Sequence, residues 1–326
     1  MRTYEKGIYT LANDNVIDQL IALLNSIEAN YSKTIPVCVI PYDDNIKKVK
    51  EEIGKRKNVF LFDDEKIIKD WEDYVNRIWK LASVGNFGRH MLGVHRKLCV
   101  FNGPFRKFVF LDADALVMNS LEHVFEMVEN YAFVVNDFQY KDKSHVFNSK
   151  SPILKQIFSD EELMKIFCVG FYASKKKLFS ETEKQNIIEQ IKKESEILYP
   201  RAPEQSILNY MVLKSGIKIK NLAFEKNKVT GNSAHTSHFT EKNHILYDKG
   251  NRLTYLHYIG VSKDVINKVC AGENLDFPYR DIFLYYRFMK EPEKMPKFTG
   301  KPKPYGQKSL KEQVIDKLRQ IRNRIL

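Results

Sequence analysis

The sequence predicts an α/β fold in which helices cover a parallel sheet. Three observations support this class: apolar runs of strand length alternate with helical patterns over residues 7–64, a buried strand follows at 107–111, and further strands and helices continue to residue 260. A chain of 326 residues, 43% of them hydrophobic, is long enough to bury a substantial core. In open sheets of this kind, ligands bind beyond the carboxyl ends of the strands.

The first part of the chain alternates strands and helices. Residues 7–12, 34–42 and 58–64 are apolar runs of strand length, and the charged segment 45–57 has a helical pattern. A longer helix is predicted over residues 13–31, because its apolar side chains recur at helical spacing: Val16, Leu20, Leu23, Leu24 and Ile27. This order favours parallel strands that are joined by crossover helices.

The remaining elements continue this pattern. Residues 83–98 contain three glycines and two histidines, and they are predicted to form a loop that leads into a helix. The strand at 107–111 is followed by a helix at 119–130. Further strands are predicted at 131–137, 217–224 and 252–260, and further helices at about 180–197 and 203–214.

The composition indicates a cytoplasmic protein. No window approaches the roughly eighteen uninterrupted apolar residues of a membrane span. The first ten residues lack the apolar core of a signal peptide. The four cysteines lie far apart without a CxxC pair, so we predict reduced core residues at all four positions: Cys38, Cys99, Cys168 and Cys270.

The net charge of +12 is concentrated at the C-terminus. From Thr299 to Leu326, eight Lys or Arg residues face two acidic residues, which gives +6 in this segment. We predict a Pro- and Lys-rich linker at 291–308 and a basic amphipathic helix at 309–326. The helix would contact anionic lipid on the inner face of the membrane, or else dock on its own domain or on a partner chain. The charge does not indicate nucleic-acid binding, because no nucleic-acid motif accompanies it.

An acidic pair ends the central strand. In "KFVFLDADALVMNS", Asp112 and Asp114 follow an apolar run, and they point to the same side if the chain stays extended past Leu111. Two carboxylates this close repel each other, so a divalent cation between them is the usual solution. The alternative is a turn in which Asp114 caps the helix at 119–130.

A second polar group follows a later strand, in "LTYLHYIGVSKD". His257 ends an apolar run, and Gly260 and Lys263 follow at intervals of three residues. The imidazole could complete a cation site, the lysine could meet a phosphate, and the glycine would let the backbone approach the ligand closely. The alternative is that His257 is simply packed within an aromatic strand.

Taken together, these stretches resemble the family-8 glycosyltransferases. The segments "NDNVIDQLIALLNSIEANY", "LDAD", "PEQSILNYM" and "HYIGVSK" occur in the order found in that family, between about residues 6 and 263. The resemblance implies a GT-A (Rossmann-like) fold with a mixed central sheet flanked by helices. It implies a catalytic domain over residues 1–290, in which elements at about 140–215 serve the acceptor.

The resemblance also implies roles for individual residues. Asp112, Asp114 and His257 would bind Mn²⁺ (or Mg²⁺) bridged to the diphosphate of a nucleotide sugar, with a UDP-sugar favoured. Gly260 and Lys263 would contact the diphosphate. The other matching positions are Asn13 and Asp14 at the base and ribose, Arg96 near the donor sugar, and Glu204 and Gln205 as the catalytic residues at that sugar.

The implied activity is the transfer of a hexose from the nucleotide sugar to a glycan or lipid-linked glycan, with retention of configuration. The sequence departs from the family at several positions, so it is identified as a divergent, bacterial-type member. Asn13 replaces an acidic residue, Val16 replaces an aromatic residue, Asp264 replaces a proline, and the Asn-Ser pair before Gly170 is missing.

Two other functions fit the acidic pair. "VFLDADALV" also resembles the first motif of haloacid-dehalogenase-like phosphatases, in which Asp112 would be the nucleophile. Those enzymes carry the motif near the N-terminus and need a later acidic pair, neither of which occurs here. The third possibility is a non-catalytic nucleotide-sugar-binding subunit of an assembly, which would bind donor and metal without releasing the nucleotide.

Overall fold

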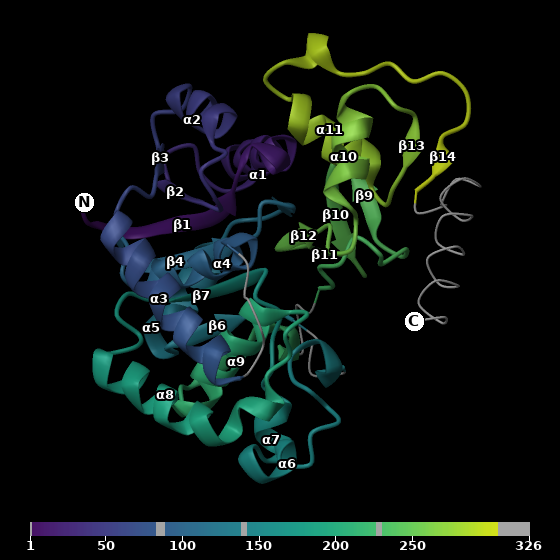
Figure 1. Cartoon of the computed structure of the whole chain (residues 1–326). Coiled ribbons are helices and arrows are strands. Elements are labelled where there is room, and N and C mark those ends of the chain that lie inside the picture. Colours follow the sequence, from purple (N-terminus) through teal and green to yellow (C-terminus); the bar gives the residue numbers. More distant parts are fainter. Residues whose placement is uncertain (1, 83–88, 138–141, 226–229, 306–326) are drawn as a thin grey trace, which may run out of the picture.

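The computed structural model describes residues 2–82, 89–137, 142–225 and 230–305. Its centre is a seven-stranded sheet in the order β3-β2-β1-β4-β7-β6-β8 (Figure 1). The strands are β1 (Tyr4–Ala12), β2 (Val37–Pro41), β3 (Val59–Leu61), β4 (Phe105–Leu111), β6 (Phe133–Val135), β7 (Phe171–Lys175) and β8 (Ile219–Asn221). All neighbouring pairs are parallel except those of β7, which runs antiparallel to β4 and β6. The sheet is therefore mixed, as the resemblance implies, and not purely parallel.

Helices cover both faces of this sheet. They are α1 (Ile17–Asn30), α2 (Lys47–Gly54), α3 (Glu65–Leu81), α4 (Arg89–His95), α5 (Glu122–Asn130), α6 (Leu154–Ile157), α7 (Asp160–Leu163), α8 (Glu181–Glu194) and α9 (Pro203–Lys214). Side chains of β4 alternate between two buried clusters. Phe108 and Phe110 pack on the side of α3, α8 and α9, whereas Val109 and Leu111 pack on the side of α1 and α5. This alternation fixes the register at which β4 delivers Asp112 to the sheet edge.

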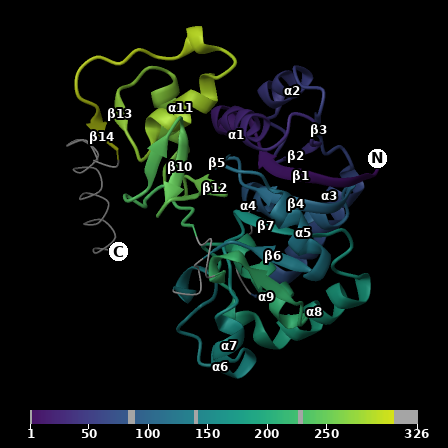
Figure 2. The same ribbon diagram turned by 180° about the vertical axis from the view of Figure 1, so that it is seen from behind.

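A smaller lobe follows the sheet in the chain and lies beside it in both views (Figures 1 and 2). It contains β9 (Thr240–Lys242), β10 (Ile245–Asp248), β11 (Asn251–Arg252), β12 (Tyr255–His257), α10 (Lys263–Cys270), β13 (Leu275–Asp276), α11 (Arg280–Phe288) and β14 (Lys303–Pro304). Strand β12 pairs antiparallel with β5 (Ala115–Val117), which directly follows the acidic turn. This pairing joins the lobe to the carboxyl end of β4.

Several predicted boundaries need correction. The strand predicted at 252–260 is interrupted at Leu253 and Thr254, and it ends at His257, after which the chain turns. The strand predicted at 217–224 ends at Asn221, where the Asn221 side chain caps a short 3-10 helix. Helix α3 and strand β7 were not predicted.

The segment predicted as a linker is described over residues 291–305. There the chain folds back on the small lobe, because β14 pairs with β13 and Phe298 lies under the Arg280 guanidinium at 4.8 Å. Tyr305 also packs against the buried cluster of this lobe. The predicted amphipathic helix at 309–326 lies outside the described residues. None of the described helices is long and apolar enough to cross a membrane.

All four cysteines are free thiols. Cys38 and Cys99 are buried in the core as predicted, whereas Cys168 and Cys270 are only partly buried. Burial raises the pKa of Cys38 well above its ordinary value, so this thiol stays protonated near neutral pH.

Candidate metal centre and cavity

The acidic pair lies in a tight turn after β4. The Asp112 N–H donates to the Gly170 carbonyl at 2.9 Å, and the Ala115 N–H donates back to the Asp112 carbonyl at 3.1 Å. The chain therefore does not stay extended past Leu111, contrary to the geometry assumed from the sequence. The turn itself brings Asp112 and Asp114 to the same side.

The pairing of β12 with β5 places a histidine against this turn. His257 is opposite Ala115 in the register, and the Tyr258 N–H donates to the Asp114 carbonyl at 2.9 Å. The His257 Nε2 lies 3.2 Å from the Asp114 Oδ1. The capping alternative for Asp114 is wrong, since α5 begins only at Glu122, after Leu121.

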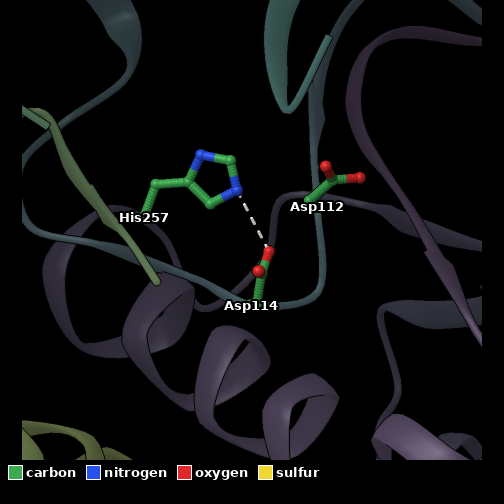
Figure 3. Close-up of side chains that lie close together, drawn as sticks. All are labelled: Asp112, Asp114 and His257. Atoms are coloured by element: carbon green, nitrogen blue, oxygen red, sulfur yellow. Dashed lines mark ion pairs between the residues drawn. The ribbon is translucent and has the colours of Figure 1, made fainter. Parts of the chain in front are cut away.

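Three side chains thus converge from two distant parts of the chain (Figure 3). One ligand atom from each of Asp112, Asp114 and His257 lies within 4.8 Å of the others. Burial lowers the pKa of His257, but the two carboxylates outweigh this effect, and the pKa is raised. Burial likewise raises the pKa of Asp114, but His257 opposes this effect and the pKa is lowered. Each of the two groups therefore favours the charged form of the other.

A lysine that the sequence did not single out completes this group. Lys97, in the 3-10 helix Arg96–Phe101, is only 5% exposed, and its Nζ lies 2.8 Å from the Asp112 Oδ1. Burial opposes the charge of Lys97, but Asp112 and Glu204 raise its pKa above the ordinary value. The sequence signal for Lys97 is its position directly after Arg96, in the "RK" pair.

Arg96 itself points elsewhere. Its Nε donates to Glu72 at 2.7 Å, and its Nη1 donates to the Pro41 carbonyl at 2.9 Å. It lines a second cavity of about 710 Å³ on the side of α3, next to Asp43 and Asp63. The structure therefore does not bring Arg96 to the group formed by Asp112, Asp114, His257 and Lys97, called here the Asp112 group.

The Asp112 group opens into a cavity of about 680 Å³. This cavity, called here the main cavity, is lined by residues from the ends of β1, β2 and β4, from the start of α1, from α4 and the 3-10 helix after it, from the start of α9, and from the segment after β12. They are Leu11, Ala12, Asn13, Asn15, Val16, Gln19, Tyr42, Asp43, Val94, Lys97, Asp112, Ala113, Asp114, Glu204, Val261 and Lys263. The lining agrees with the general rule that ligands bind beyond the carboxyl ends of the strands.

Three further predicted site residues line the main cavity. Asn13 donates to Asp43 at 2.8 Å and accepts from the Asn15 N–H, so its side chain shapes the loop before α1. Lys263 is exposed at the first position of α10, and within the described part of the chain it forms no ion pair. Burial raises the pKa of the third, Glu204, although the nearby Lys97 acts in the opposite direction.

The other predicted residues, His257 among them, are not part of the lining. The Asp14 Oδ1 accepts from the Val49 N–H at 3.0 Å and so ties the loop to α2. Gly260 has a φ of +80°, a conformation that glycine adopts readily, and it serves the turn after β12. The Gln205 Nε2 donates to the His145 carbonyl at 2.9 Å, which anchors the start of α9.

Gly170 is expected to be intolerant of substitution. A Cβ there would lie 2.4 Å from the His257 Cε1 and 3.0 Å from the Asp112 Oδ2. Gly170→Ala should displace the His257 ring and lower the free energy of unfolding by about 1–3 kcal/mol. Urea unfolding measures this loss. Gly54→Ala is the matched control, because no heavy atom lies within 4 Å of its Cβ. An equal stability of the two variants would contradict the packing described here.

Comparison with known proteins identifies the family. Residues 5–268 match the family model Mannosyl_trans3, described as "Mannosyltransferase putative". The chain belongs to this family. The match places the protein among the glycosyltransferases, so the phosphatase alternative is wrong. A search of curated proteins found no significant match.

Solved structures of glycosyltransferases share the fold of this mannosyltransferase-family protein. The apo structure of the bifunctional glycosyltransferase WbbM is 17% identical with a TM-score of 0.56, and the match covers 90% of this chain and 52% of WbbM. The galactosyltransferase LgtC, solved with donor and acceptor sugar analogues, is 17% identical with a TM-score of 0.50, over 79% of this chain and 89% of LgtC. These likenesses show the GT-A fold. The chain spans about half the length of the WbbM chain that it matches.

Proposed function

We propose that this glycosyltransferase is metal-dependent and transfers a hexose from a nucleoside-diphosphate sugar to a glycan or lipid-linked glycan. The observation that carries the proposal is the convergence of Asp112, Asp114 and His257, of which the two aspartates line the main cavity. The name of the family makes mannose a natural candidate for the transferred sugar. For the donor base, uridine remains favoured from the sequence, with guanosine as the alternative to test.

The donor set fits a divalent cation. Two carboxylates and one imidazole supply the oxygen and nitrogen ligands that Mn²⁺ accepts, and their ligand atoms already lie within 4.8 Å of one another. Mg²⁺ is the alternative ion, with its stronger preference for oxygen. When bound, the ion would neutralise the charge of the donor diphosphate.

One lysine of the cavity, Lys263, would act on the same diphosphate. Departure of the nucleoside diphosphate concentrates negative charge on its phosphate oxygens, and cations fixed in advance stabilise that charge. Lys263 is exposed at the cavity without an ion-pair partner in the described chain, so its ammonium is available to a ligand. Lys97 is already paired with Asp112 and would mainly hold that carboxylate in position.

The carboxyl group of Glu204 is the best-placed catalytic group. It lines the cavity next to Lys97, whereas the side chain of Gln205 is tied to the His145 carbonyl outside it. Oxygen lone pairs near the anomeric carbon would stabilise the oxocarbenium-like sugar, as carboxylates do in glycoside hydrolysis. We therefore propose a direct role for Glu204, a positioning role for Gln205, and retention of configuration.

Binding of nucleotides to the whole protein tests this proposal. Uridine, guanosine, adenosine and cytidine diphosphates, each with and without Mn²⁺, are added in a thermal-shift assay. A ligand at one hundred times its dissociation constant should stabilise the fold by about 2.7 kcal/mol. A rise in melting temperature that depends on Mn²⁺ and is confined to one nucleotide is expected, and it would identify the base. If no nucleotide shifts the melting temperature with Mn²⁺, the proposed function is wrong.

A further inference from the structure

One buried polar side chain of the main cavity has no hydrogen-bond partner. Gln19 lies in the first turn of α1, lines the cavity and is only 4% exposed. Its Oε1 is fully buried and accepts no hydrogen bond. Within the described part of the chain, its amide nitrogen has no partner either. The Oε1 is therefore the unsatisfied buried atom of this side chain in the ligand-free protein.

An unsatisfied amide at this position is costly for folding. Leaving a buried polar group without a hydrogen bond costs about 1–3 kcal/mol, and the great majority of buried polar groups have a partner. The neighbouring side chains Leu20, Leu23 and Leu24 show that α1 otherwise packs with apolar residues. A methionine would fill the same volume without this cost. The ligand-free structure therefore shows no role for this amide in stabilising the fold.

The location of Gln19 indicates which part of a ligand it meets. Val16, the N-cap of α1, precedes it by three residues and also lines the cavity, together with Asn13 and Asn15. The Asn267 side chain donates to the Asn15 carbonyl at 3.0 Å, so α10 packs against the start of α1 there. The lining residues of the loop before α1 and of its start are neutral or apolar: Asn13, Asn15, Val16 and Gln19.

We propose that the terminal amide of Gln19 binds the nucleoside of the donor and contributes to the choice of its base. The proposal rests on the proposed function and deepens it. An amide carries one donor and one acceptor side by side, and it can exchange them by a half-turn about its last bond. It therefore matches a base edge, on which a donor and an acceptor are also adjacent, as in amide pairing with adenine.

Calorimetric titration of the full chain with Gln19→Met tests this inference. The probes are the nucleoside diphosphates of the thermal-shift assay and inorganic pyrophosphate, each with Mn²⁺. Gln19→Met should weaken binding of the preferred nucleoside diphosphate about tenfold, since it removes one hydrogen-bonding group. Pyrophosphate, which has no nucleoside, should bind equally to both proteins. Gln19→Leu repeats the test with a second apolar side chain.

The melting temperature of the ligand-free variant is a second readout. It should be equal to or higher than that of the natural protein, because an unsatisfied polar group has been removed. Gln156→Met, at an exposed position of α6, is the matched control and should leave binding unchanged. Unchanged nucleotide binding in Gln19→Met would overturn the inference, as would an equal loss of pyrophosphate binding. Failure of the natural protein to bind any nucleotide would instead overturn the proposed function itself.

Discussion

Asp114→Asn is expected to lower turnover about a thousandfold while the protein remains folded, since one interaction with the charge of the transition state is commonly worth two to three orders of magnitude. The change removes one anionic metal ligand, and it also releases His257 from an ion pair of 3.2 Å. The imidazole can then become neutral. It can donate a hydrogen bond to the amide oxygen of the new asparagine or accept one from its amide nitrogen. The fold should therefore tolerate this substitution better than a loss of charge at Lys97.

The measurement is the rate of nucleotide release as a function of Mn²⁺ concentration. Asp114→Asn should need a higher Mn²⁺ concentration for half-maximal activity and should not regain the full rate at saturation. Asp276→Asn, at an exposed position of β13, makes the same chemical change far from the turn and should keep full activity. Full activity of Asp114→Asn would refute the metal site.

Lys97→Met should have the second largest effect, on both turnover and stability. It leaves Asp112 facing Asp114 without the ammonium that now lies 2.8 Å from the Asp112 Oδ1. Asp112 keeps 25% of its side chain exposed, so water limits the loss of stability to about 1–3 kcal/mol. Turnover should fall about a hundredfold, because the carboxylate is no longer held in position. Mn²⁺ should restore part of the lost stability, because it would take over the neutralisation of the two carboxylates.

Arg96→Met is the informative comparison, because the sequence suggested Arg96 as the residue near the donor sugar. Its guanidinium is bound to Glu72 and the Pro41 carbonyl, outside the main cavity. We expect this variant to lose stability but to keep the KM for the donor and most of kcat in the folded fraction. The contrary pattern, a donor defect in Arg96→Met and none in Lys97→Met, would return the role to Arg96. Steady-state kinetics with urea unfolding separates these outcomes.

Much of the fold could be predicted because the spacing of apolar residues along the sequence indicates which side chains are buried in a helix or strand. The strands at the N-terminal half of the sheet and helices α1, α5, α8 and α9 lie where apolar spacing indicated them. Strand β7 and the folded segment 291–305 were missed, since their structure depends on partners distant in sequence. The residues Lys303 and Pro304 form a strand only because Leu275 and Asp276 offer an edge.

The site was predicted in part for the same reason. A sequence pattern cannot distinguish the adjacent basic residues Arg96 and Lys97. The short 3-10 helix that carries them directs only Lys97 toward Asp112. The unsatisfied amide of Gln19 could not have been noticed at all. In the sequence it is one polar residue within an amphipathic helix, and its lack of a partner exists only in three dimensions.

The sequence by itself determined the fold class, the resemblance to glycosyltransferases, and the chemical types at the centre of the site: two carboxylates, one imidazole and one lysine after a glycine. These follow from local composition and order. The tertiary structure decided which side chains meet. The tight turn at Asp112 brings the carboxylates together, and the antiparallel pairing of β12 with β5 carries His257 to them from 143 residues further along the chain. Such contacts depend on packing between distant segments, which no local pattern encodes.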